Sequence, residues 1–365
     1  MSGKEIDEQK RKFLGISAVA LSRMSLVSAG LFTPDRASAQ LRASTGVSVI
    51  GYPETGPVQV ERVEYTSRNT QTRIAGNLFK PANFDPSRRY AAIVVTHPIG
   101  GVKEQTAGLY ALKLAEQGFI TLAYDASYQG ESGGEPRLME LPSARVDDIS
   151  GAIDFLCTHP QVDVNRIGSL GICGGGGYVM NAAQTELRIK AVASVSAADI
   201  GSLRREGLGG SRSPEERIKL LQDAAAQRMR EAQGESIRLV AAVPESDANF
   251  TASTPVMYRE GYEYYRTARG QHPNAPAVSV FSTLPSQMSF NAFAQIETIS
   301  PRPILLIVGS RADSAYFSEE AYEKANEPKE LFRVSGATHI DMYDKPQYVA
   351  PAIDKLNIFF NHYLV

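Results

Sequence analysis

The sequence predicts an α/β fold in which a mainly parallel sheet is flanked by helices. Two observations predict it. Short runs rich in apolar and β-branched residues alternate with longer stretches of helical spacing, and the run 90–96 is almost entirely apolar. Continuous apolar runs are typical of strands buried on both faces, and strand–helix alternation implies right-handed crossovers between parallel strands.

The alternation begins near Val60 and continues to Asp199. We expect core strands at 60–65, 72–79, 90–96, 119–124, 166–172 and 191–195, of which the first two form an antiparallel pair. Helical spacing predicts intervening helices at 106–117 and 146–156, and a short helix after the glycine-rich turn that follows residue 172.

After Asp199 the alternation stops, and it resumes near residue 300. The intervening residues include a charged helical stretch at 214–230 and a Tyr-rich one at 258–265. Strands at 304–308 and 331–334 and helices near 319–325 and 348–363 complete the pattern. We therefore expect a helical cap insertion between the sixth and seventh core strands. The chain divides into a signal peptide at 1–39, a first core part at 40–199, the cap at 200–290 and a second core part at 291–365.

Side chains of the insertion allow two interpretations. The basic residues Arg204, Arg205, Arg212 and Arg217 are balanced by Glu206, Glu215 and Glu216, so we interpret them as solvated surface. Aromatic residues also gather there, and most of them are expected to pack the cap, with an aromatic substrate pocket as the alternative. They are Tyr258, Tyr262, Tyr264, Tyr265, Phe281, Phe290 and Phe293.

Composition excludes several classes of protein. Hydrophobic residues make up 43% and charged residues 21%, so the chain can bury a core and is not disordered as a whole. Lys and Arg number 38 against 40 Asp and Glu, a balance that argues against a dedicated nucleic-acid binder. Two cysteines exclude a disulfide scaffold. Five dispersed histidines without an H-E-x-x-H motif argue against a catalytic metal, and we expect no cofactor.

The first 39 residues have the pattern of a secretory signal. A basic cluster at 10–12 precedes the apolar run 13–21, and the Ala-Ser-Ala sequence at 37–39 offers small residues before a cleavage point. Arg23 interrupts the apolar stretch, so a cytoplasmic protein is the alternative to a periplasmic or secreted one. No uninterrupted apolar stretch reaches the ~18 residues that a membrane span requires.

The most informative segment, 170–178, reads Leu-Gly-Ile-Cys-Gly-Gly-Gly-Gly-Tyr. It follows a predicted buried strand and opens a helix, the setting in which G-x-S-x-G forms a nucleophile elbow, with Cys173 where serine is usual. Gly171 and Gly175 relieve the collisions of so tight a turn. A helix N-terminus favours the thiolate, so we predict that Cys173 is the nucleophile. Cys157 is expected in the core; a disulfide between the two is the alternative for an exported protein.

A cysteine nucleophile needs a base and an acid, in the chain order nucleophile, acid, histidine. His339 follows the last strand, where the base belongs, whereas His362 is near the chain end and is expected to be solvated. Asp313 follows the strand 304–308 and is the predicted acid. Asp341 and Glu319 are the alternative acids, and the structural alternative for Asp313 is a turn or helix-cap role.

Two backbone N–H groups are expected to form the oxyanion hole. One belongs to Gly174, which follows the nucleophile, and the other to Ile99 in the loop 96–101, Thr-His-Pro-Ile-Gly-Gly. His97 precedes this loop, and we expect it to brace the loop rather than act as a base.

From about residue 60 to 365 the chain resembles an α/β-hydrolase. The Gly-x-Cys-x-Gly elbow is similar to that of dienelactone hydrolases and the related polyketide-transferase or thiohydrolase-like group, and the stretches 103–105, 124–132 and 336–339 match the same group. The resemblance implies the fold and the triad positions. The insertion after Asp199 departs from the compact dienelactone hydrolases, so the resemblance does not imply their substrate.

Together these features predict an enzyme that cleaves a small-molecule ester, thioester or lactone. The chemistry is a Cys-His-Asp triad with an acyl-cysteine intermediate. The runner-up is an acyltransferase that passes the acyl group to an alcohol or amine. Further alternatives are a hydrolase-like binding protein without catalysis and a peptidase that cleaves after proline.

Overall fold

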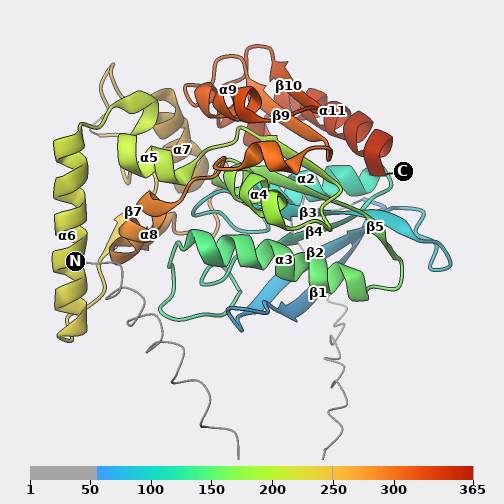
Figure 1. Ribbon diagram of the computed structural model, residues 1–365, viewed down its shortest axis with the longest axis horizontal. Coiled ribbons are helices and arrows are strands. Elements are labelled where there is room, and N and C mark those ends of the chain that lie inside the picture. Colours follow the sequence, from blue (N-terminus) through green and yellow to red (C-terminus); the bar gives the residue numbers. More distant parts are fainter. Residues whose placement is uncertain (1–55, 249, 365) are drawn as a thin grey trace, which may run out of the picture. The chain divides into compact units, whose positions relative to one another are not determined.

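An eight-stranded sheet lies at the centre of the fold, in the order β1-β2-β4-β3-β5-β6-β9-β10 (Figure 1). The computed structural model describes residues 56–248 and 250–364. The strands are β1 (Gln59–Thr66), β2 (Arg73–Lys80), β3 (Tyr90–Thr96), β4 (Ile120–Tyr124), β5 (Val162–Ile172), β6 (Ala191–Val195), β9 (Ile304–Gly309) and β10 (Lys329–Val334). β2 pairs antiparallel with β1 and β4, and all other neighbours are parallel. The predicted antiparallel start and parallel remainder are confirmed.

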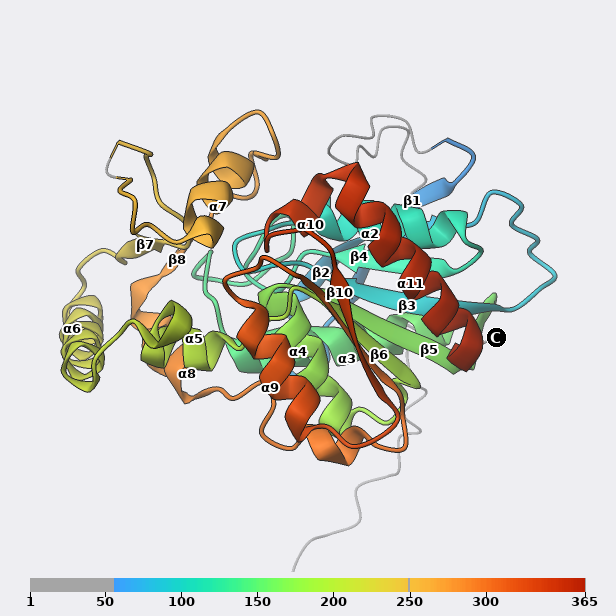
Figure 2. The same cartoon turned by 90° about the horizontal axis from the view of Figure 1, so that it is seen from above.

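Helices cover both faces of the sheet. α2 (Thr106–Glu116) and α11 (Pro346–Leu364) lie on one face, and α3 (Pro142–Thr158), α4 (Gly174–Thr185) and α9 (Ala315–Lys324) lie on the other (Figure 2). Every residue of β3, β4, β6 and β9 is buried as a result, which is why these strands have continuous apolar runs instead of alternating ones.

The cap insertion runs from the end of β6 to the start of β9, as predicted. Its helices are α5 (Ile200–Glu206), α6 (Pro214–Ala232), α7 (Val256–Arg266) and α8 (Leu284–Ser289), with 3-10 turns at Leu208–Gly210, Phe281–Thr283 and Ile296–Ile299. Polar side chains cap the N-termini of α5 and α6. Asp199 accepts the backbone N–H groups of Gly201 and Ser202, and Ser213 forms a capping box with Glu216. The insertion is not purely helical, because β7 (Leu239–Ala241) and β8 (Val278–Val280) form an antiparallel pair.

All the described residues belong to one compact unit. The cap shares this unit with the core. The predicted signal peptide at 1–39 lies outside the described residues. Within the described residues, no helix is both long and apolar enough to cross a membrane.

Candidate active site

Cys173 lies in the sharp turn between β5 and α4. Its backbone has φ 55° and ψ −124°, a region that side chains with a Cβ avoid and that costs about 1–3 kcal/mol. The two flanking glycines make the turn possible. A Cβ on Gly171 would lie 2.1 Å from the Gly175 carbonyl oxygen, and one on Gly175 would lie 2.4 Å from the Thr96 carbonyl oxygen. The local geometry is that of a nucleophile elbow.

The surroundings of Cys173 favour the neutral thiol at rest. Burial raises the pKa of Cys173, and this outweighs hydrogen bonds from the Tyr343 hydroxyl and the Gly174 N–H, which lower it, as does the Arg145 charge. The predicted effect of the helix N-terminus, which favours the thiolate, is therefore present but smaller than the effect of burial. Both cysteines are free, and Cys157 packs against the core as predicted.

His339 is fully buried beside Cys173, and both line one cavity. The Nδ1 atom lies 2.5 Å from the Ser314 hydroxyl, and Nε2 lies 3.3 Å from the Tyr343 hydroxyl. The Tyr343 hydroxyl also interacts with the Cys173 thiol and lowers its pKa. A chain of polar contacts thus runs from the thiol through the tyrosine to the imidazole and on to the serine. Burial lowers the pKa of His339 to about 4, so the imidazole is neutral at pH 7.

Asp313 is not the Nδ1 partner of His339 in this structure. Its Oδ2 accepts the backbone N–H of Met257 at 3.0 Å, and its buried Oδ1 has no hydrogen-bond partner. Met257 is in the first turn of α7, where backbone N–H groups lack intrahelical acceptors, so Asp313 satisfies one of them. This is the helix-cap role named as the structural alternative. Ser314, the next residue, takes the position expected of the acid.

Neither alternative acid contacts His339. Asp341 accepts the Thr338 N–H at 3.1 Å and pairs with Lys345 at 2.5 Å. Glu319 pairs with Arg333 at 2.8 Å near the surface. His362 is exposed on α11, as predicted.

The sequence patterns did not identify Tyr343, which lies between Cys173 and His339. It is in the short helix α10 (Asp341–Asp344), four residues after His339. The four-residue spacing between His339 and Tyr343 could have indicated this contact, because it places two side chains on one side of a helical turn. Tyr264 and Tyr265 contact Tyr343 edge-on at ring-centre distances of 5.2 and 6.4 Å and fix its ring.

The two predicted oxyanion donors lie together. The Gly174 N–H points at the Cys173 thiol. The Ile99 side chain packs closely against Gly174, and a Cβ added to Gly174 would lie 2.7 Å from that side chain. The backbone nitrogen of Ile99 would lie 3.7 Å from the same Cβ. Among the described residues the Ile99 N–H has no acceptor, so it is free to bind a developing oxyanion.

The loop that holds Ile99 is braced by His97, as predicted. Its Nδ1 donates to the Pro98 carbonyl at 2.7 Å, and its Nε2 accepts the Ala126 N–H at 3.1 Å. Arg145 donates to the His97 carbonyl at 2.6 Å and to the ring at 3.0 Å. Burial and the Arg145 charge hold the pKa of His97 well below its usual value, which keeps the imidazole neutral, as these bonds require.

Arg145 is almost fully buried beneath the elbow. It pairs with buried Glu140 at 3.6 Å and lies over the Tyr178 ring of α4 at 5.0 Å. Tyr178 donates to Glu140 at 2.7 Å. The elbow helix and the oxyanion loop are therefore held by one buried charged group.

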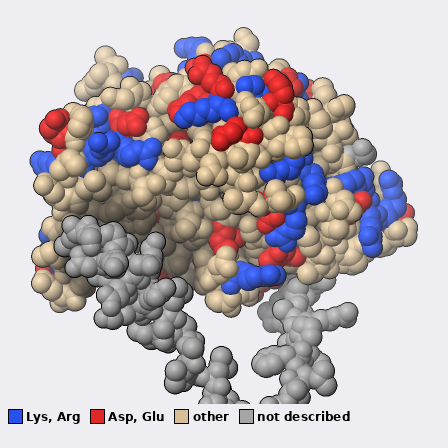
Figure 3. All heavy atoms as spheres, in the orientation of Figure 1, with Lys and Arg blue, Asp and Glu red and all other residues tan. Residues whose placement is uncertain are grey.

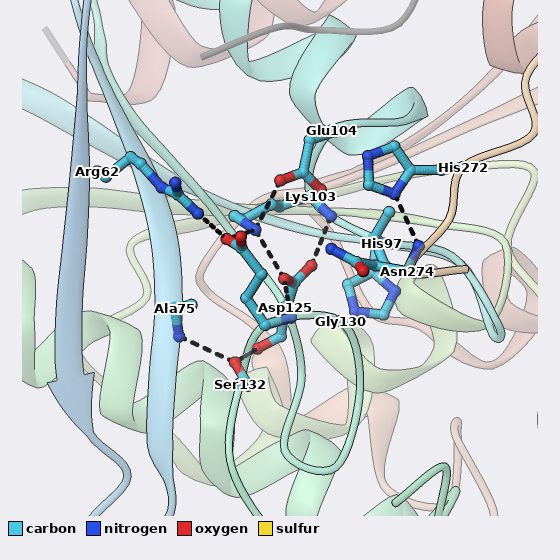
Figure 4. A network of polar contacts seen from close by, with 12 residues as sticks. Arg62, Ala75, His97, Lys103, Glu104, Asp125, Gly130, Ser132, His272 and Asn274 are labelled. Carbon is cyan, nitrogen blue, oxygen red and sulfur yellow. Dashed lines mark hydrogen bonds and ion pairs between the residues drawn. The ribbon is translucent and has the colours of Figure 1, made fainter. Parts of the chain in front are cut away.

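A second buried network holds the other end of this loop (Figure 4). The Lys103 ammonium lies 2.6 Å from Glu104, 2.8 Å from Asp125 and 2.8 Å from Glu131. Three carboxylates this close are also the donor set of a cation site, but the ammonium already lies among them. The ion pair with Arg62 and that with Lys103 lower the pKa of Glu131 to about 2. The cluster therefore stabilises the loop, and we do not assign a metal ion to it.

The cavity above Cys173 is small, about 70 Å³, and mostly apolar. Core and cap share its lining: Ile99, Cys173, Ile200, Leu203, Arg204, Ala242, Val243, Met257, Tyr258, Gly261, Tyr265, His339, Ile340 and Tyr343. Of the aromatic residues considered above, Tyr258 and Tyr265 line the cavity. Packing is the role of Tyr264, Phe290 and Phe293, as expected for most of the set.

Cap and core are joined around this cavity. Besides the Asp313–Met257 bond, Thr338 donates to Glu260 of α7 at 2.5 Å. Arg269, shortly after α7, pairs with Asp344 at 2.6 Å. The loop that holds His339 therefore bonds directly to the cap.

Comparison with known proteins agrees with this geometry. A family model described as "Dienelactone hydrolase family" matches residues 74–202, which include the elbow and the oxyanion loop. The uncharacterized protein YcjY of Escherichia coli K12 is 42% identical over 83% of this chain and 99% of its own length. The polyketide transferase claH of Penicillium crustosum is 26% identical over 77% of this chain and 91% of its own.

Solved structures give the same fold. The crystal structure of hypothetical protein PA2218 from Pseudomonas aeruginosa has a TM-score of 0.83 and 37% identity, covering 89% of this chain and 99% of that one. The α/β hydrolase GrgF from Penicillium sp. sh18 has a TM-score of 0.71 at 21% identity, covering 84% and 99%. The chain therefore has the α/β-hydrolase fold and contains a dienelactone hydrolase family domain at residues 74–202.

Proposed function

We propose that this protein hydrolyses a small-molecule ester, thioester or lactone through an acyl-cysteine intermediate on Cys173. One observation carries the proposal: a cysteine in a strained elbow shares a cavity with a neutral, buried histidine, and a tyrosine hydroxyl that contacts the histidine also lowers the pKa of the cysteine. Family membership supports hydrolase chemistry in general terms. The nucleophile, base and substrate class are our assignment.

Attack begins with a proton transfer. In the tautomer with its proton on Nδ1, His339 donates to Ser314 and leaves Nε2 as an acceptor. The Cys173 proton passes to the Tyr343 oxygen while the Tyr343 proton passes to Nε2. The thiolate then forms a bond to the substrate carbonyl carbon, and the carbonyl π electrons move to oxygen. Gly174 and Ile99 N–H groups bind that oxyanion.

Breakdown of this intermediate returns the proton. The oxyanion re-forms the carbonyl, the bond to the leaving oxygen or sulfur breaks, and the imidazolium protonates the leaving group. A water molecule then attacks the acyl-cysteine with His339 as the base. The thiolate leaves and is reprotonated through the same contacts, so the enzyme returns to its neutral state.

The acyltransferase alternative differs only in this last step, because an alcohol or amine replaces water. The relative named polyketide transferase favours keeping it as the second candidate. The peptidase alternative has less support. No Asp or Glu lines the cavity within the described residues, so no side chain there is suited to bind a substrate amine.

A periplasmic or secreted location is a separate proposal, based on the sequence of residues 1–39 alone. Fractionation of the source cells followed by N-terminal sequencing tests it. A mature chain beginning at Gln40 outside the cytoplasm supports export, and intact Met1 protein confined to the cytoplasm contradicts it.

A panel of activated esters, thioesters and lactones tests the function, with wild type compared with Cys173→Ala. We expect turnover by wild type and a loss of about 10³-fold or more in the variant. Cys157→Ala is the matched control and should retain turnover. Equal activity of wild type and Cys173→Ala would refute the proposal. Adding alcohol or amine acceptors and identifying the products distinguishes transfer from hydrolysis.

A further inference from the structure

A second cavity lies in the cap, next to the one above Cys173. It measures about 220 Å³ and lies between α5, α6 and the β7–β8 pair. Three arginines line it together with apolar residues, and no Asp or Glu is among the lining residues that the structure describes. The lining comprises Arg204, Arg212, Leu220, Arg238, Val240, Ala241, Ser279, Val280, Phe281, Leu284 and Gln287.

The three guanidinium groups are held in place without being neutralised. Arg204 donates from Nε to Gln287 at 3.0 Å, and Arg212 donates to the Arg204 carbonyl. Arg238 lies over the Phe281 ring at 4.3 Å. No carboxylate of the described residues forms an ion pair with any of the three. Since each guanidinium has five N–H donors, most of these donors remain available.

The absence of carboxylates is confined to the lining of this cavity. The face shown in Figure 3 has basic and acidic side chains interspersed, and the neighbouring Arg205 does lie near an acidic partner, Glu206, at 4.0 Å. The buried carboxylate that acts on Arg204 from the core is Glu140, which is already bonded to Tyr178 and Arg145. Burial lowers the pKa of Arg204 despite Glu140, so this cation gains from an added anion.

Arg204 connects the two cavities. It lines both, and the segment 240–243 contributes Val240 and Ala241 to one and Ala242 and Val243 to the other. The two cavities are therefore adjacent, with Arg204 at their common boundary. The balance of charges along the sequence predicted solvated surface for Arg204 and Arg212, and that interpretation is wrong for these two.

We propose that the arginine-lined cavity binds an anionic group, a carboxylate or phosphate, on the same molecule whose acyl group is transferred to Cys173. Guanidinium groups recognise both anions through paired N–H donors. The apolar lining accommodates the hydrocarbon between the anion and the reacting carbonyl. The inference rests on the proposed function and narrows its substrate class to anionic esters, thioesters or lactones.

Matched substrates test this selectivity. Aryl thioesters of adipic and suberic acid, each with one free carboxylate, are compared with thioesters of hexanoic and octanoic acid, which end in a methyl group. We expect kcat/KM to be at least about tenfold higher for the carboxylate series. Arg238→Gln should reduce this ratio toward one. Arg238 is exposed and its guanidinium makes no hydrogen bond to the described residues, so the fold should tolerate the change. Arg204→Gln should have the same effect.

Arg228→Gln is the matched control, because Arg228 is exposed on α6 and does not line the cavity. It should leave the ratio unchanged. A wild-type ratio near one, or a ratio unaffected by Arg238→Gln and Arg204→Gln, would overturn the inference while leaving the proposed hydrolase intact.

A binding measurement separates this inference from the proposed function. Calorimetric titration of the full chain with adipate and, in a second arm, with inorganic phosphate should show binding that Arg238→Gln weakens about tenfold or more and Arg228→Gln does not. The anion that binds more tightly identifies the natural group. Arginine-dependent binding without any ester turnover would support the cavity and refute the hydrolase. Binding that is absent, or equal in Arg238→Gln, would refute the cavity.

Discussion

The Nδ1 atom of His339 lies 2.5 Å from the Ser314 hydroxyl, while the carboxylate of the adjacent Asp313 accepts the N–H of Met257 at 3.0 Å. A hydroxyl can orient an imidazole but does not stabilise imidazolium as a carboxylate does. Ser314→Ala removes one hydrogen bond, worth about 1 kcal/mol, so we expect kcat to fall about 5- to 10-fold.

Asp313→Asn is the matching test of the predicted triad acid. In the arrangement described here an asparagine still accepts the Met257 N–H, so kcat should fall no more than a few fold. A loss of about 10⁴-fold would show that Asp313 turns to His339 during catalysis, because that is the size expected for a triad acid. Steady-state kinetics of both variants, with Asp341→Asn as the control, checks this.

The pH dependence of kcat/KM reports the state of the base. His339 acts only when neutral, and burial lowers its pKa to about 4, so activity should fall as pH drops through about 4 and stay level above pH 5. The unfolded chain takes up this proton near pH 6.5, so His339 stabilises the fold fully above pH 6.5 and progressively less down to pH 4. Circular dichroism at each pH is the control for unfolding. An acid limb centred at 6.5 or higher would contradict a base without a carboxylate partner.

Tyr343→Phe removes the hydroxyl between thiol and imidazole and keeps the ring. We expect kcat to fall about 10²-fold with little change in KM, since the relay acts on the proton transfer rather than on binding. The hydroxyl also lowers the pKa of Cys173, so the variant should react more slowly with iodoacetamide at pH 8. Tyr322→Phe is the control, because Tyr322 is on α9 and does not line the cavity. Wild-type kcat and thiol reactivity in Tyr343→Phe would exclude the relay.

The buried Arg145–Glu140 pair should have a large effect on stability. Arg145→Met leaves the Glu140 carboxylate without its cation, so the free energy of unfolding should fall by about 3–5 kcal/mol in urea titration. Arg333→Met breaks an exposed pair with Glu319 and should cost about 1 kcal/mol or less. Adding Glu140→Leu to Arg145→Met should recover part of the loss. Equal effects of the two arginine substitutions would contradict the buried pair.

Much of the fold follows from the sequence, because its signals are local. The apolar run 90–96 becomes β3 with the same bounds, since burial on both faces demands apolar residues throughout. The elbow was predictable for a similar reason. Gly171 and Gly175 are required by contacts within one turn, and the spacing of the two glycines records that requirement.

The site was predicted less completely because its contacts join distant segments. Asp313 bonds to Met257, 56 residues earlier in the chain, and no local pattern indicates that the cap would take up this carboxylate. The position of the Arg204 side chain in the cavity lining could not be predicted for the same reason. Charge balance among sequence neighbours describes net charge, whereas the lining of the cavity depends on where α5 packs against α8.

Acylation of Cys173 is the central claim, and one measurement addresses it directly. A thioester substrate is mixed with excess wild-type enzyme, quenched with acid within milliseconds to seconds, and analysed by intact mass and peptide mapping. The account predicts a mass increase equal to the acyl group on the peptide containing Cys173, absent in Cys173→Ala and retained in Cys157→Ala. Substrate turnover with no acyl group on Cys173 at any time, or with the same turnover in Cys173→Ala, would contradict it.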